Sequence, residues 1–119
     1  MSRDFRKLRV FQLADELLLR VYRISSFPTE ERFSLQAQLR RAALSAAANI
    51  VEGSARRTTR EYSNFINIAA GSATEARYLA DVSGRLGFMG AEDATELVSR
   101  YTELSARLQT LIGSLSSEP

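Results

Sequence analysis

The stretch Leu44–Arg57 reads LSAAANIVEGSARR, and it marks the point where one helix ends and another is about to begin. Gly53 stands where the C-terminal cap of an alanine-rich helix is expected. Thr58-Thr59-Arg60-Glu61 then has the spacing of a capping box, in which the threonine accepts from a free backbone N–H while the glutamate reaches back to the cap residue. We therefore expect two helices that fold back antiparallel about a turn at residues 53–58.

Helical periodicity continues on both sides of this turn, and strand signals are few. The apolar pattern predicts helices at about residues 5–25, 30 or 35 to 52, 59–84 and 91–112, with a loose tail, GSLSSEP, at 113–119. A chain of 119 residues is long enough for one domain, spanning 1–119. Four helices with short connections predict an all-α, up-down-up-down antiparallel four-helix bundle.

The composition excludes many kinds of active site. The chain has no cysteine and no histidine, so it lacks thiolate nucleophiles, imidazole bases, disulfides and the usual structural zinc ligands. No segment resembles a signal peptide or a membrane span, and we expect a soluble, cytoplasmic protein. Glu52, Glu61 and Glu75 lack the Glu-x-x-His pairs of di-iron bundles, so we predict no metal and no cofactor, with a magnesium site as the alternative.

The charge is divided unevenly along the chain, although the formal net charge is only +2. Residues 1–60 carry 12 Lys and Arg against 6 Asp and Glu, whereas residues 61–119 carry 4 against 8. Almost every cation is arginine, which suits bidentate contacts with phosphate or carboxylate; a codon bias would give the same composition without any function.

Polar side chains form a stripe on the predicted second helix, beside its apolar stripe. Successive side chains of an α-helix are rotated by about 100° about its axis, and at this spacing five polar side chains project from the same side of the helix: Gln38, Arg41, Ser45, Asn49 and Glu52. On the third helix, Ser72 and Glu75 fall inside an apolar arc, where a carboxylate is costly unless it is paired. Folding the two helices antiparallel predicts an Arg41–Glu75 ion pair and puts Glu52 near the N-terminus of the third helix. We interpret these residues as a structural polar network rather than a ligand site.

The run from Phe27 to Ala76 resembles a four-helix-bundle family encoded in intervening sequences of large-subunit ribosomal RNA genes. The family pattern QxxRA…S…NIxEG…F…AxGSxxE is matched at Gln38, Arg41, Ser45, Asn49, Glu52, Gly53, Gly71, Ser72 and Glu75. Ser34, where glycine is usual, and Ala46-Ala47, where isoleucine-proline is common, depart from it. The resemblance implies a homopentameric ring and a kinship with accessory proteins of diversity-generating retroelements, which bind nucleic acid and a reverse transcriptase.

Arginines gather near the turn between the second and third helices. Arg56, Arg57 and Arg60, with Arg40 on the second helix, are the candidate nucleic-acid-binding residues, and an N-terminal group could extend them into a phosphate-binding rim: Arg3, Arg6, Lys7 and Arg9. The alternative is a solvated loop whose arginines pair with glutamates of a neighbouring subunit. A ring would repeat the cluster in every subunit, which favours binding of a polyanion. Because aromatic residues are few, we expect recognition of backbone and shape rather than base stacking.

Three hypotheses follow. The first is a non-enzymatic nucleic-acid-binding ring in which the apolar faces of the first and fourth helices seal the subunits. The second is a scaffold that binds a protein and no nucleic acid. The third, which we expect least, is a metal-dependent nuclease or other enzyme that uses Glu52 or Glu75.

Overall fold

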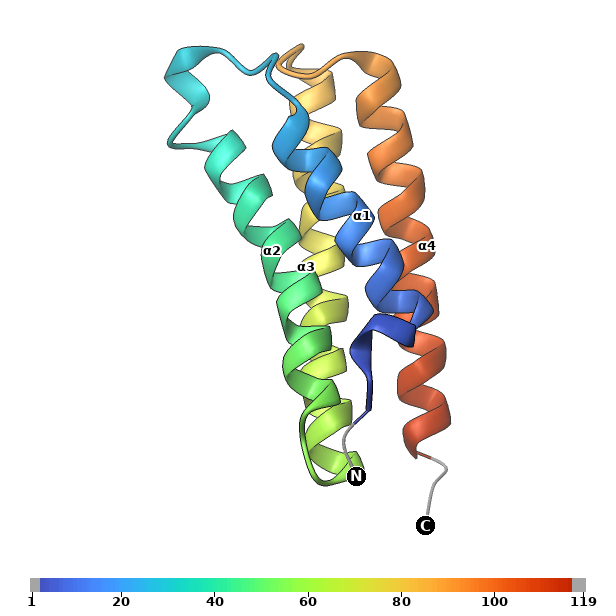
Figure 1. Ribbon diagram of the computed structural model, residues 1–119. Helices are drawn as coiled ribbons and strands as arrows, with labels where there is room; N and C mark the ends of the chain where they lie inside the picture. Colours follow the sequence, from blue (N-terminus) through green and yellow to red (C-terminus); the bar gives the residue numbers. More distant parts are fainter. Residues whose placement is uncertain (1–2, 117–119) are drawn as a thin grey trace.

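The computed structural model describes residues 3–116, which fold into a bundle of four α-helices (Figure 1). The helices are α1 (Arg9–Arg23), α2 (Leu35–Ser54), α3 (Thr59–Arg85) and α4 (Ala91–Ser116), and single 3-10 turns at Phe5–Lys7 and Thr29–Glu31 precede α1 and α2. Successive helices run in opposite directions, and the bundle is 49 Å long and 20 Å wide. The predicted all-α fold with four antiparallel helices is confirmed over these residues.

The helix boundaries differ from the predicted ones at three places. A 3-10 turn replaces the expected first turn of α1, and α2 begins at Leu35, the later of the two starts considered. The tail predicted to be loose is helical as far as Ser116, because the apolar stripe of α4 continues to Leu115, which is buried. Residues 117–119 of that tail lie outside the described part of the chain.

The helices are arranged so that α3 packs against both α2 and α4, and α1 lies across the opposite side of the bundle, between α2 and α4 (Figure 1). The inner faces of α2 and α3 are mostly alanine, and the fully buried positions include Ala43, Ala46, Ala69, Ala73, Ala76 and Ala80. Small side chains let two helix axes approach closely. The largest fully buried side chains come from all four helices and are most numerous on α4: Leu17 of α1, Leu39 and Ile50 of α2, Ile66 of α3, and Leu97, Tyr101, Leu104 and Leu108 of α4.

The apolar faces of α1 and α4 are therefore used inside the subunit. Leu17 of α1 and Leu97, Leu104 and Leu108 of α4 are each at most 1% exposed. These two apolar faces form part of the core of the bundle, and the expectation that they seal one subunit to the next stays a prediction. Large apolar side chains are left exposed on three of the helices, namely Leu19 and Tyr22 on α1, Leu44 on α2, and Ile68 and Tyr78 on α3.

Gly53 has a packing role rather than a capping role. The α2 helix continues through Gly53 to Ser54 and leaves at Ala55 with right-handed dihedral angles, so the predicted glycine cap is wrong. A Cβ atom at Gly53 would lie 2.8 Å from the Cβ of Phe65 and 3.1 Å from Cδ1 of Tyr62. The bare backbone of Gly53 therefore allows the end of α2 to lie directly against the start of α3.

Specific backbone motifs end α3 on both sides, and the sequence predicts the N-terminal one. Thr58 Oγ1 accepts from the N–H of Glu61 at 3.1 Å and donates to its carboxylate at 2.9 Å, which confirms the N-terminal cap. At the other end Gly87 has φ +77°, and the N–H of Phe88 donates to the carbonyl of Ser83 at 2.9 Å. This 6→1 bond is the mark of a Schellman motif, which needs a left-handed residue at the position of Gly87.

Tyr101 of α4 is the largest fully buried side chain of the bundle. Its hydroxyl is buried and has no hydrogen-bond partner among the described residues. Burial raises the pKa of Tyr101 well above its usual value, because the phenolate would have to form away from water.

We predict that Gly53→Ala lowers the free energy of unfolding by about 1–3 kcal/mol, because the added methyl group overlaps the Cβ of Phe65. Urea unfolding followed by circular dichroism measures this change. Gly113→Ala is the matched control, since nothing lies within 4 Å of a Cβ at that helical glycine. Equal stability of the two variants would contradict the proposed close contact.

Tyr101→Phe should raise the free energy of unfolding by about 1 kcal/mol, since it removes a buried hydroxyl that has no partner and keeps the ring. Thermal unfolding compares it with Tyr78→Phe, which alters an exposed ring and should leave the melting temperature unchanged. A lower melting temperature for Tyr101→Phe would show that the hydroxyl makes a stabilising hydrogen bond.

Candidate nucleic-acid interface

The N-terminal segment and the turn between α2 and α3 meet at one end of the bundle (Figure 1). The backbone N–H of Arg3 donates to the carbonyl of Ser54 at 3.1 Å, which ties the segment to the end of α2. We call this the basic end, and its basic side chains are Arg3, Arg6, Lys7, Arg9, Arg56, Arg57, Arg60 and Arg107.

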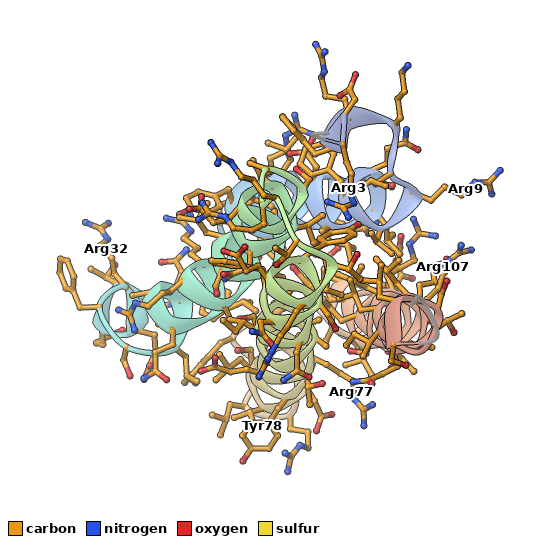
Figure 2. All side chains as sticks on the ribbon, turned by 90° about the horizontal axis from the view of Figure 1, so that it is seen from below. Arg3, Arg9, Arg32, Arg77, Tyr78 and Arg107 are labelled. Carbon is orange, nitrogen blue, oxygen red and sulfur yellow. The ribbon has the colours of Figure 1, made fainter. Side chains whose placement is uncertain are left out.

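Arg3 is held by the start of α3. Its guanidinium lies over the ring of Tyr62, 4.0 Å from the centroid, and its Nη1 donates to the carbonyl of Arg56 at 3.4 Å. A cation over an aromatic face is stabilised by the ring quadrupole. Burial raises the pKa of Tyr62, and the charge of Arg3 opposes that shift. In the view along the bundle axis, Arg3 lies close to the α2–α3 turn (Figure 2).

Arg56 is occupied by contacts within the chain. Its Nη2 pairs with Oε1 of Glu52 at 2.9 Å, its Nε donates to the Glu52 carbonyl at 3.2 Å, and its guanidinium lies over the ring of Phe65 at 5.1 Å. Glu52 therefore has Arg56 as its partner, while the N-terminus of α3, where we expected Glu52, is capped by Thr58. Arg56 therefore contributes positive charge to this end of the bundle, but its guanidinium group is already engaged by contacts within the chain.

Arg57 and Arg60 are the cations of this turn that could bind an external anion. Both side chains are exposed, and neither has an ion pair or side-chain hydrogen bond within residues 3–116. Arg57 lies in the turn and Arg60 in the first turn of α3. Their guanidinium groups are free to meet an anion from solvent.

The N-terminal cations are differently engaged. Arg6 pairs with Asp4 at 3.0 Å, and the hydrogen bond from Arg6 lowers the pKa of Asp4. Lys7 and Arg9 are exposed. Figure 2 shows Arg9 pointing outward on the same side as Arg107, which pairs with Glu103 at 3.0 Å. Arg107 was not among the residues predicted from the sequence; it lies about two and a half turns before the end of α4 and lines the same surface hollow as Arg9.

Arg40 does not join this group. It lies in the first turns of α2, near the opposite end of the bundle, where Nη2 donates to the carbonyl of Tyr22 at 3.2 Å. Its guanidinium lies 4.7 Å from the centroid of the Tyr22 ring, and its Nε is buried. The structure therefore removes Arg40 from the predicted binding residues and assigns it to the contact between α1 and α2.

The predicted polar network is smaller than expected. Ser45 Oγ and Ser72 Oγ are 2.7 Å apart, and Asn49 Nδ2 donates to Ser45 Oγ at 3.0 Å. Gln38, Arg41 and Glu75 are exposed and lie outside this network, and Glu52 belongs to the ion pair with Arg56. Ser45, Asn49 and Ser72 thus bridge α2 and α3 with half-buried hydroxyl and amide groups.

The predicted Arg41–Glu75 ion pair is wrong. Both side chains are exposed, and the described part of the chain contains no ion pair for either. The reason is that Glu75 does not lie in the core. Ile68 on the same face is 51% exposed, so this part of the broad apolar arc of α3 faces solvent, and Ala69, Ala73 and Ala76 form the inner face.

The carboxylates do not gather into a metal-binding cluster. No group of three or more acidic side chains suited to a metal ion occurs between residues 3 and 116. Across that same span, no helix combines the length and the apolar character that a bilayer crossing requires.

Comparison with known proteins places this bundle in a family. A model described as 23S rRNA-intervening sequence protein matches residues 6–110. A solved structure of a protein with unknown function, from the S23 ribosomal protein family of Bacteroides thetaiotaomicron VPI-5482, has a TM-score of 0.78 and 25% sequence identity, and the match covers 87% of this chain and 97% of that one. No curated protein matches the chain. Because the family model spans nearly the whole bundle, the chain belongs to the 23S rRNA-intervening sequence protein family.

Proposed function

We propose that the protein is a non-enzymatic, self-assembling bundle that binds the phosphate backbone of structured RNA or DNA at its basic end. The observation that carries this proposal is the pair of exposed arginines without partners, Arg57 and Arg60, beside the ordered Arg3. Arginine guanidinium groups match phosphate in a bidentate geometry, and phosphate contacts supply most of the affinity of a nucleic-acid-binding surface.

The opposite end of the bundle carries a mixture of charges. Arg23, Arg32 and Arg85 lie there with Glu30 and Glu31 of the 3-10 turn before α2 and with Glu92 and Asp93 in the first turn of α4. The two ends of a bundle 49 Å long act independently on a ligand, because the Debye length in physiological salt is only about 8 Å. A polyanion is therefore attracted more strongly to the basic end, where cations outnumber carboxylates.

The aromatic side chains at the basic end support recognition of the backbone rather than of unpaired bases. Tyr62 is 2% exposed beneath Arg3, Phe65 lies under Arg56, and Phe5 packs edge-on against Phe11 with centroids 4.8 Å apart. Proteins that bind single strands without sequence preference present open aromatic faces on which bases stack. A structured duplex is therefore a better ligand for this surface than a single strand.

Self-assembly would strengthen such binding. In a closed ring, such as the homopentamer that the family resemblance implies, Arg57 and Arg60 would be repeated in every subunit, and the fields of neighbouring basic ends would add. The family is also named for sequences that interrupt 23S rRNA, which supports a nucleic acid as the partner.

We predict that Arg57→Glu/Arg60→Glu weakens binding to a labelled RNA or DNA duplex by more than tenfold, without loss of helical circular dichroism. Fluorescence anisotropy across a salt series measures the affinity. The slope of log affinity against log salt should become shallower by about 0.9 for each lost duplex phosphate contact.

Arg23→Glu/Arg32→Glu is the matched control, because it makes the same change of charge at exposed arginines near the opposite end of the bundle. It should leave the affinity within about twofold, given the screening length. Equal losses in the two variants would show that only net charge matters. Flat titrations of the wild-type protein with duplex and single-stranded nucleic acids at low salt would contradict the proposal and favour a protein scaffold.

A further inference from the structure

Ion pairs join α1 to α4 along their line of contact. Arg20 of α1 pairs with Glu96 of α4, and Glu16 of α1 pairs with Arg100 of α4 at 3.2 Å. The two helices are antiparallel, so a step back along α1 corresponds to an equal step forward along α4 (Figure 1). These pairs therefore determine which side chains face each other further along the two helices.

The next position in this series holds two arginines instead of an ion pair. Seven residues, or about two helical turns, separate Arg9 from Glu16 and Arg107 from Arg100. Arg9 and Arg107 line one surface hollow of about 290 Å³ between α1 and α4, and both side chains point outward on the same side in Figure 2. Two like charges at one position repel each other, so this arrangement does not stabilise the fold.

The position of Arg9 is unfavourable for a second reason. Arg9 is the first residue of α1, and no acidic residue lies in the first turn of that helix. The positive end of the helix dipole disfavours a cation there. The Arg9 side chain is exposed and makes no ion pair or hydrogen bond within residues 3–116. Because no contact in the described chain offsets these two effects, the position of Arg9 indicates a negatively charged ligand.

The two carboxylates of the hollow are already paired. Glu103 pairs through one oxygen with Arg107 at 3.0 Å and through the other with Arg100 at 3.6 Å, and Glu16 pairs with Arg100. Arg107 uses only Nε for its hydrogen bond to Glu103, which leaves its terminal Nη groups free within the described residues. With three arginines against two glutamates, the hollow keeps one positive charge in excess, and the unused donors belong to Arg9 and Arg107.

We propose that this hollow binds a phosphate group between the guanidinium groups of Arg9 and Arg107. A guanidinium group donates two parallel N–H bonds to phosphate oxygens, and the negative charge of the phosphate offsets the repulsion between the two arginines. Glu103 orients Arg107 for this contact by holding its Nε. The inference does not depend on the proposed function, because Arg57 and Arg60 do not line the hollow.

Titration of the isotope-labelled full chain with inorganic pyrophosphate, at constant ionic strength and without nucleic acid, tests this site. The Nε–H signals of Arg9 and Arg107 should shift to saturation. Arg9→Gln should weaken binding by about tenfold or more, because it removes a charged donor, and the affinity of Arg9→Lys should lie between those of Arg9→Gln and the wild type. Arg77→Gln is the matched control and should bind as the wild type does, since Arg77 is exposed on α3 outside the hollow.

Shifts that do not saturate, or an affinity that Arg9→Gln leaves unchanged, would overturn the phosphate site and leave the role of Arg57 and Arg60 untouched. The affinity of Arg9→Gln for a nucleic-acid duplex then identifies the source of the phosphate. Weaker duplex binding assigns the hollow to a backbone phosphate of the bound duplex, whereas unchanged duplex binding assigns it to a small phosphate compound. Both of these results support the site, provided that pyrophosphate binds there.

Discussion

The close antiparallel packing of α2 against α3 determines where the other parts of this protein lie. Alanines on both inner faces leave little side-chain volume between the helices. At the end of α2, Gly53 has no side chain, so the backbone lies directly against Phe65 and Tyr62 of α3. Because the two helices are this close, the connection between them is short, and Thr58 caps α3 almost as soon as α2 has ended. The contact between Ser45 and Ser72 then fixes the register of the two helices, while Tyr101 of α4 is the largest side chain in the core.

The same packing determines two exposed surfaces. At the turn, it exposes Arg57 and Arg60, and the guanidinium of Arg3 stacks on the ring of Tyr62, so the irregular N-terminal segment becomes part of the basic end. Along the helices, alanines line much of the inner faces, and Leu44 of α2 and Ile68 of α3 remain exposed. The cations at the end and the exposed apolar side chains along the helices therefore lie on separate parts of the bundle.

Periodicity and the cap at Thr58 were sufficient to predict four antiparallel helices, since the apolar stripes are long, whereas the cap expected at Gly53 was not found. Helical periodicity placed Glu75 wrongly because a broad apolar arc does not reveal which part of it faces inward, and that depends on the alanines of the neighbouring helix. Arg40 was grouped with Arg56 although about 24 Å of helix rise separates them, an error that helix geometry alone could have corrected. Arg107 could likewise have been found from the direction of α4. The contact of Arg3 with Tyr62 comes from an irregular segment and has no periodic signal.

The central claim is that nucleic acid binds at the end of the bundle formed by the N-terminal segment and the α2–α3 turn. The most direct measurement is the change in backbone amide chemical shifts when a short unlabelled RNA or DNA duplex is added to isotope-labelled protein. The account predicts that the largest changes fall within residues 3–9 and 55–62, with little change at residues 85–96 near the opposite end. Changes centred on residues 85–96, or spread evenly over the bundle, would contradict it.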